Sequence, residues 1–239
     1  MMEARLAFVP KYRELFAEVF GDDWPNIRHA YKAIAAFERT IVQTDTPFDN
    51  YMRGEDNALS KKQKRGLDLF AGKANCIACH TGPLLTDEQY YNLGVPPYAG
   101  WEDNELAQIT FRFEIFAKGS NEKLYRHVKD DPGLYFRSKD KQHKGKFRTP
   151  SLRYTKYTFP YMHNGMLETL RDVVVFYNNG GGKNEFADTK SPLMQPLGLS
   201  DSEVDDLVAF LESLSGDEIL IDEPDLPVME PLPPAMAQN

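Results

Sequence analysis

A single Cys-x-x-Cys-His motif, formed by Cys76, Cys79 and His80, constrains the fold more than any other feature of the sequence. It contains both cysteines of the chain. In c-type haem proteins the two thiols of such a motif join the haem vinyl groups, and the histidine becomes the proximal iron ligand. A zinc site would need two more Cys or His ligands close by, and a thioredoxin-like redox pair would need a strand before it and a helix after it. The other histidines stand singly, so the motif predicts one covalently attached haem c.

Composition limits the kinds of partner. The chain has 239 residues, a formal net charge of -8 and 41% hydrophobic residues. Because binding to phosphate requires a basic face, we expect no nucleic-acid partner. No segment approaches the roughly 18 apolar residues that a membrane span requires, so we expect no membrane span. The acidity permits docking to a basic protein such as a small cytochrome.

The beginning of the chain bears on the expected localisation. Residues 1–24 lack the charged start, apolar run and cleavage site of an export signal. Haem c is attached on the exported side of a membrane, which predicts a periplasmic protein. Either the signal has been removed or the chain begins inside a longer gene product.

Helical periodicity and capping residues predict a mainly α fold. Residues 12–20 and 25–42 carry apolar stripes at helical spacing, the first ending at Gly21. Capping boxes start two further helices, one with Ser60 and Gln63, the other with Ser200 and Glu203. Gly66 and Phe70 offer a small residue beside a large one, where the helix from residue 60 could cross the last helix. Two capped helices on either side of a haem motif indicate a cytochrome c-like domain.

The remaining segments set the expected domain boundaries. Residues 44–57 are turn-rich and are interpreted as a linker, and the alternation in "ITFRFEIF", residues 109–116, predicts a short strand. The proline-rich last 23 residues are not expected to be helical. We therefore expect a helical segment, a haem domain with an apparent insertion at about 101–129, and a tail. Their bounds are 1–52, 53–216 and 217–239.

Several longer motifs carry a family resemblance. The runs "AIAAFERT", "PFDNYMRG", "RGLDLFAGKANCIACHTGP", "YYNLGVPP", "FRTPSLR", "PYMHNG" and "FYNNGG" resemble the bacterial di-haem cytochrome c peroxidases and their relative MauG. Members of this family carry two haem motifs, one in each cytochrome c-like domain, whereas this chain has one. The resemblance implies that residues up to about 52 are the last helices of the first domain and that the second domain follows. The peroxide-binding haem and its acidic catalytic residue are then absent from this chain, and its catalytic residues are unknown.

The second axial ligand of the iron has several candidates by chemistry. They are Met52, Met162, Met166, Met194, His163 and Tyr177. In the classical peroxidases of the resembled family, a methionine lies fourteen residues after the histidine that corresponds to His163. Tyr177 stands at that position here, and the resemblance to MauG implies that it binds the iron. Alternatively, Tyr177 is a core aromatic residue and Met162 or Met166 is the ligand.

Other residues are expected to contact the haem or a second ion. Arg148 and Arg153 have the forked guanidinium groups that suit the paired haem propionates. The family resemblance implies that His163 lies near a propionate without binding the iron. It also implies that the carbonyls of Thr158 and Pro160 help to hold a possible calcium ion.

The resemblance implies an oxidoreductase that reduces hydrogen peroxide with electrons relayed through this haem, in a MauG-like branch with tyrosine ligation. Its expected partners are an electron-donor protein (a small cytochrome, a cupredoxin or a protein substrate) and either a second haem-bearing chain or the missing N-terminal half. The alternative is an electron-transfer module with one haem and no peroxide-binding haem.

Overall fold

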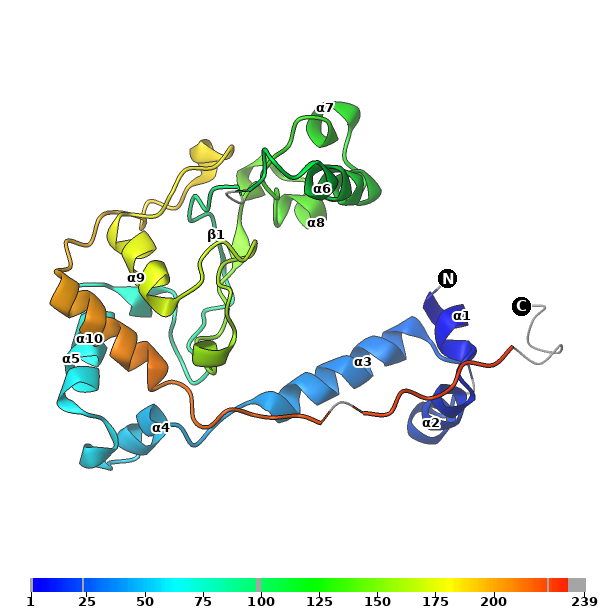
Figure 1. Cartoon of the computed structure of the whole chain (residues 1–239), viewed down its shortest axis with the longest axis horizontal. Helices are drawn as coiled ribbons and strands as arrows, with labels where there is room; N and C mark the ends of the chain where they lie inside the picture. Colours follow the sequence, from blue (N-terminus) through cyan, green and yellow to red (C-terminus); the bar gives the residue numbers. More distant parts are fainter. Residues whose placement is uncertain (1, 23, 98–99, 223, 232–239) are drawn as a thin grey trace. The chain divides into compact units, whose positions relative to one another are not determined.

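The computed structural model describes residues 2–22, 24–97, 100–222 and 224–231, and the chain forms two compact units. One unit contains the chain up to residue 42 together with the tail from residue 218, and the other contains residues 43–217. The fold is mainly α (Figure 1), and one two-stranded sheet is found among the described residues. None of the helices in the described ranges is long and apolar enough to cross a membrane.

The first unit contains the helices predicted from the first forty residues. Its elements are α1 (Met2–Ala7), α2 (Pro10–Phe20), α3 (Ile27–Glu38) and η1 (Arg39–Ile41). Gly21 ends α2 with a φ of 69°, a left-handed conformation that glycine adopts without a steric penalty. The described tail residues 218–222 and 224–231 form no helix, and Glu230 N–H donates to the Phe8 carbonyl at 2.6 Å.

The second unit is built on the crossing of α5 (Lys61–Ala71) and α10 (Asp201–Glu212), which lie side by side in Figure 1. Both predicted capping boxes are present, at Ser60 and at Ser200. The predicted crossing at Gly66 is confirmed, because a Cβ atom there would lie 2.6 Å from Cβ of Phe210 and would overlap the Asp206 carbonyl. The absence of a side chain at Gly66 thus lets the two helices approach closely.

A hydrophobic core surrounds this crossing. Its fully buried centre includes Phe210 and Leu214, and α9 (Leu170–Asn178) contributes Val174 from a third helix. Arg65 adds a two-pronged ion pair to Asp206, with N–O distances of 2.6 and 2.7 Å. The haem motif follows α5 directly and Cys76 packs against this core, so the helix crossing supports the candidate site.

The segment interpreted as a linker is largely helical, which corrects that interpretation. It forms α4 (Pro47–Met52) and η2 (Asp56–Ala58). Thr46 caps α4 with a box closed by Asp49, and the Phe48 ring meets Phe210 edge-on at 5.5 Å. The compact unit with the haem motif therefore begins at Gln43, before the boundary at residue 52 that the sequence suggested.

The predicted strand at residues 109–116 is wrong, because these residues belong to the helix α6 (Glu105–Ala117). Asn104 caps this helix, accepting a hydrogen bond from Ala107 N–H. Only Phe111 and Ile115 among its large apolar residues enter the local core, and they are four positions apart, which is helical spacing. The alternating apolar residues therefore belong to two faces of a helix, one buried with Phe111 and Ile115 and one exposed with Ile109 and Phe113.

The remaining elements are short. They are η3 (Cys76–Ala78), β1 (Tyr90–Tyr91), α7 (Glu122–Tyr125), α8 (Tyr135–Ser138), η4 (Lys141–His143), β2 (Phe147–Arg148), η5 (Thr155–Tyr157) and η6 (Ala187–Thr189). Strands β1 and β2 pair antiparallel, with Tyr90 opposite Arg148 and Tyr91 opposite Phe147. This small sheet joins the segment after the haem motif to the segment that carries the two candidate arginines.

Candidate haem-binding site

The haem-attachment motif forms a tight turn at the end of α5. Asn75 adopts a left-handed conformation with φ 48°, η3 follows, and His80 N–H donates to the Cys76 carbonyl at 2.9 Å. Cys76 and Cys79 are free, partly buried thiols. Burial raises the pKa of Cys76 to about 12 and also raises the pKa of Cys79. A redox-active cysteine pair needs a lowered thiol pKa, so the turn does not have the electrostatics of a thioredoxin-like site.

A zinc site also finds no support in the described part of the chain. Those residues contain no group of three or more His, Cys, Asp or Glu side chains that could hold a metal ion. The cysteine pair is instead arranged with its neighbouring histidine alone, as covalent attachment of haem requires.

His80 is oriented as an iron ligand should be. Its Nδ1 lies 3.0 Å from the Leu85 carbonyl, which accepts the Nδ1 proton and leaves Nε2 free for a metal. Leu85 has a φ of 53°, and its N–H donates to the Gly82 carbonyl at 3.0 Å. Burial lowers the pKa of His80, so the neutral, ligating form of the ring dominates at neutral pH.

Tyr177 lies near the haem motif, at the end of α9. Loss of water around its phenol raises its pKa, and the charges of Cys76 and Cys79 raise it further. Such an effect acts over several ångströms, so the phenol lies within electrostatic range of both thiols. Cys76 also packs against the core cluster that contains Val174 of α9, which places the helix of Tyr177 beside the haem motif. Met52, one of the alternative ligands, is 65% exposed on α4.

His163 contacts the small sheet through a stacked ring. The Phe147 ring lies parallel to the imidazole, with centroids 3.8 Å apart and planes 11° apart. Burial against this ring lowers the pKa of His163, and the opposing effect of the Asp131 charge is smaller. The neutral imidazole can therefore donate one hydrogen bond and accept another, and its place near a haem propionate stays a prediction.

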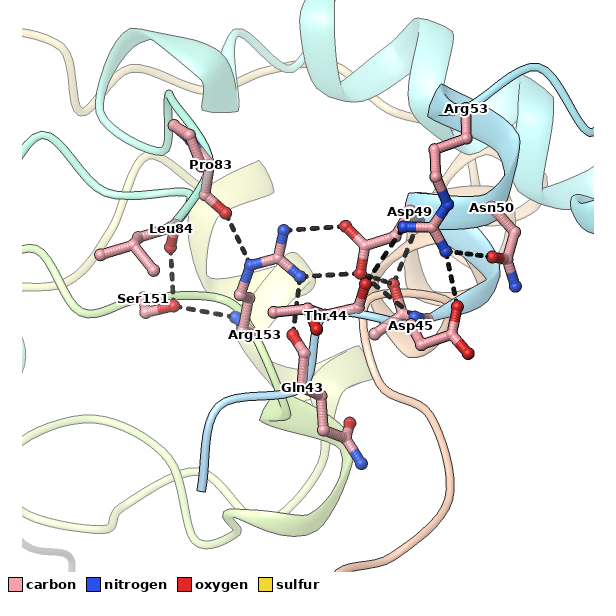
Figure 2. A network of polar contacts seen from close by, with 11 residues as sticks. Gln43, Thr44, Asp45, Asp49, Asn50, Arg53, Pro83, Leu84, Ser151 and Arg153 are labelled. Atoms are coloured by element: carbon pink, nitrogen blue, oxygen red, sulfur yellow. Dashed lines mark hydrogen bonds and ion pairs between the residues drawn. The ribbon is translucent and has the colours of Figure 1, made fainter. Parts of the chain in front are cut away.

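The two predicted arginines differ in their surroundings. Arg148 is exposed, with Nη1 4.0 Å from Glu88, and can turn towards a ligand. Arg153 is 12% exposed and paired with Asp49 at 2.9 Å. Figure 2 shows its guanidinium between Asp49 and the Pro83 carbonyl, which accepts from Nε at 2.6 Å. The propionate role stays a prediction for both, and Arg153 already serves as a structural tie between the haem loop and α4.

The calcium prediction concerns a turn whose backbone is unusual. Thr158 follows η5, and the peptide bond between Phe159 and Pro160 is cis. Tyr161 N–H then donates to the Leu167 carbonyl at 2.6 Å. Carbonyl oxygens are suitable calcium ligands, and calcium binding at Thr158 and Pro160 stays a prediction.

Three contacts of the site were not foreseen from the sequence. The Leu85 carbonyl orients His80, Asp49 pairs with Arg153, and the Tyr91 hydroxyl donates to Asp87 at 2.8 Å beside Cys79. The Thr46-Pro-Phe-Asp49 capping box was a readable signal for the position of Asp49. A carbonyl acceptor such as that of Leu85 leaves no signal in the sequence.

These residues fit a covalent haem: two adjacent thiols, an imidazole with a free Nε2, and a phenol close to the thiols. The helical frame around them is that of a cytochrome c-like domain. The fold and the site together define a c-type cytochrome.

Sequence comparison places the chain in a family. The sequence profile described as di-haem cytochrome c peroxidase matches residues 1–57. The cytochrome-c peroxidase IdrP1 of Pseudomonas sp. (strain SCT) is 50% identical over 237 residues, which are 98% of this chain and 62% of that protein. The methylamine utilization protein MauG of Methylorubrum extorquens is 35% identical over 93% of this chain and 54% of that protein. The chain belongs to the family of di-haem cytochrome c peroxidases and MauG.

Solved structures agree with this assignment. A MauG-like protein associated with microbial copper homeostasis matches with a TM-score of 0.64 at 30% identity, over 90% of this chain and 61% of that one. The di-haem peroxidase BthA from Burkholderia thailandensis matches with a TM-score of 0.52 at 27% identity, over 78% and 51%. The present chain spans 62% and 60% of the length of two curated relatives, the IdrP1 peroxidases of Pseudomonas sp. (strain SCT) and Denitromonas iodatirespirans.

Proposed function

We propose that this chain carries the electron-transferring haem of a peroxide-reducing enzyme, with His80 and Tyr177 as the two axial ligands. The observation that supports the proposal is the packing of Cys76 against the core cluster of Val174 on α9, the helix that carries Tyr177, with the phenol in electrostatic range of both thiols. When bound, a haem of this kind takes up and releases single electrons. A phenolate ligand favours the ferric and higher oxidation states, whereas methionine raises the potential and favours simple electron transfer.

The residues of the chain have distinct tasks in this proposal. Cys76 and Cys79 hold the haem by covalent bonds, and the Leu85 carbonyl keeps the Nδ1 proton of His80 so that Nε2 faces the metal. Tyr177 must lose its proton to bind as phenolate. Because burial holds the pKa of this phenol above its usual value, binding as phenolate would require the charge of a bound iron to favour loss of the proton.

The proposed activity also needs a peroxide-reducing haem and an electron donor, and both lie outside the sites described above. Hydrogen peroxide would be reduced at a second haem, on another part of the protein or another chain, with electrons relayed through the haem of this chain. An electron-donor protein, either a small cytochrome, a cupredoxin or a protein substrate, would supply them in the periplasm. A calcium ion at Thr158 and Pro160 would steady the turn between the two haem sites.

The second candidate function is an electron-transfer module with one haem. Its support is that the sequence contains two cysteines, enough for one attachment motif. Such a module would exchange electrons with a donor and an acceptor and would not consume peroxide, because both axial positions of its iron are filled.

Spectroscopy of the haem-loaded protein tests the ligand assignment. Tyr177→Phe should change the ferric absorption and electron paramagnetic resonance spectra, and the matched variants Tyr90→Phe and Met166→Leu should leave both unchanged. A methionine-type spectrum that persists in Tyr177→Phe would refute the assignment. A pyridine haemochrome assay with intact mass gives the haems per chain, and peroxide-dependent turnover separates the two candidate functions.

A further inference from the structure

A strongly basic segment interrupts this acidic protein. Residues 137–148, "RSKDKQHKGKFR", contain six Lys or Arg residues and one acidic residue, in a chain with a net charge of -8. We call residues 137–148 the basic segment. It runs from the end of α8 through η4 to β2. Like charges so close in sequence repel one another, so their concentration here needs a compensating interaction.

The positive charges of the basic segment are largely uncompensated. Arg137, Lys139, Lys141 and Arg148 are exposed. In the described part of the chain, the one ion pair of the segment is the 4.0 Å contact between Arg148 and Glu88. Asp140, its acidic residue, caps η4 by accepting from Gln142 N–H at 2.9 Å. The exposed cations of the basic segment therefore outnumber its one carboxylate, in a chain whose net charge is negative.

The segment is also held in a defined shape. Leu134 N–H donates to the Lys146 carbonyl at 2.9 Å, which closes a loop of residues 133–146. The ammonium of Lys139 lies 5.8 Å from the Phe136 ring centroid, and that of Lys144 lies 5.4 Å from the Tyr135 ring centroid. Cation–π contacts of this kind orient lysine side chains while leaving their charge in place. Such compact loops with neighbouring ends frequently carry function.

The basic segment leads directly into the haem-binding site. Phe147 stands opposite Tyr91 in the small sheet, and its ring stacks on His163 at 3.8 Å. Two positions beyond the segment, the backbone of Pro150 lies close to the His80 imidazole. A protein bound to the basic segment would therefore lie beside the haem ligand.

We propose that the basic segment is the docking surface for the acidic face of a small redox protein that delivers electrons to the haem. This inference rests on the proposed function in one respect, that the haem accepts electrons from an outside protein. One electron passes from the reduced donor to the ferric iron, and no bond is made or broken. The positive charge of the basic segment thus favours a partner with an acidic surface. The net charge of -8 for the whole chain had instead suggested a basic partner.

Binding and reduction can be measured on the full-length haem-loaded protein with three probes. Reduced plant-type ferredoxin supplies an acidic face, a low-potential cytochrome c3 supplies a basic one, and dithionite reduces the haem without docking. All three are strong enough reductants for a ferric haem with a phenolate ligand. The test variant is Arg137→Glu with Lys141→Glu. The matched control is Lys61→Glu with Lys62→Glu, which makes the same charge change at the exposed start of α5. Calorimetry gives the affinity and stopped-flow absorption gives the reduction rate.

The proposal predicts that reduced ferredoxin reduces the wild type faster than reduced cytochrome c3 does at low ionic strength. The test variant should lose about tenfold or more in this rate and a similar factor in affinity, and both losses should shrink at high salt. The control variant and dithionite reduction should stay near the wild-type values.

Equal loss in the control variant, or no loss in the test variant, would overturn the docking surface. So would binding of a short DNA duplex that the test variant abolishes while reduction by ferredoxin is unaffected. A haem that dithionite also fails to reduce would instead overturn the proposed function, and the binding measurement would still decide the docking surface.

Discussion

Arg153 and Asp49 form a buried ion pair in which the two guanidinium nitrogens Nη1 and Nη2 each lie 2.9 Å from one carboxylate oxygen (Figure 2). The two side chains are only 12% and 13% exposed. Arg153 also donates to the carbonyls of Gln43 and Pro83, at 3.0 and 2.6 Å. One guanidinium thus joins the loop after the haem motif, the start of the compact unit and the capped end of α4.

Replacing this arginine should destabilise the protein strongly. Arg153→Met leaves the Asp49 carboxylate buried without a counter-charge, which costs about 3 kcal/mol. Arg53→Met is the control, because Arg53 pairs at the surface with Asp45, where the side chains are 52% and 82% exposed. The control should lose less than about 1 kcal/mol. Urea unfolding of the haem-loaded variants measures both, and equal losses would contradict the structural role of the buried pair.

The same pair predicts a defined acid sensitivity. The hydrogen bonds from Arg153 lower the pKa of Asp49 from 3.8 to about 2. A carboxyl group with a lowered folded-state pKa adds stability above its unfolded pKa and loses it as the pH falls through the folded value. Stability should therefore decline by about 2 kcal/mol between pH 4 and pH 2. In Arg153→Met this part of the pH dependence should be absent, and an unchanged profile in that variant would assign the decline to other groups.

The helix boundaries were predictable because their signals are local. The boxes at Ser60 and Ser200 use hydrogen bonds that span three residues, and both are present. The strand assigned to residues 109–116 was wrong because alternating apolar residues on a short segment also fit a helix whose second face stays exposed. Ile109 and Phe113 are both 66% exposed on α6, and no local pattern distinguishes that exposure from burial in a sheet.

The sequence predicted which residues would bind the haem, but it did not predict the backbone groups that orient them. The motif supplied Cys76, Cys79 and His80, and the resemblance supplied Tyr177, which lies on the helix α9 whose Val174 shares a core cluster with Cys76. The acceptor for His80 is a backbone carbonyl in a turn with a φ of 53° at Leu85, and such a turn depends on tertiary packing. Long-range partners of this kind follow from the fold rather than from spacing.

Asp130 predicts a pH dependence of folding stability with the opposite sign to that of Asp49. It is 6% exposed, and burial raises its pKa from 3.8 to about 6. A raised carboxyl pKa adds stability below the unfolded value, and this stability is lost as the pH rises through 6. In the wild type, Glu185 N–H donates to the Asp130 carboxylate at 2.8 Å. Asp130→Asn keeps an oxygen that can accept this hydrogen bond and removes the buried charge. The variant should gain about 1 to 2 kcal/mol at pH 7 and nothing at pH 4.

The control for this change is Asp188→Asn, at an exposed position in η6. Its stability should stay within about 0.5 kcal/mol of the wild type at pH 7. Thermal unfolding across pH 4 to 8 measures both variants. A loss of stability in Asp130→Asn at pH 7 would mean that the charged carboxylate is required where it lies.

Gly66 sets the distance between α5 and α10, and Gly66→Ala tests this directly. Alanine favours a helix over glycine by about 1 kcal/mol, so the change would stabilise an exposed helix. Here the new Cβ would lie 2.6 Å from Cβ of Phe210 and would overlap the Asp206 backbone, which cannot swing aside. Overpacking typically costs about 1 to 3 kcal/mol, and the backbone contact favours the upper part of that range. Gly66→Ala should therefore lose about 1 to 2 kcal/mol in urea unfolding. Lys62→Ala at the exposed start of the same helix should change little, and a stabilised Gly66→Ala would show that the helices separate without cost.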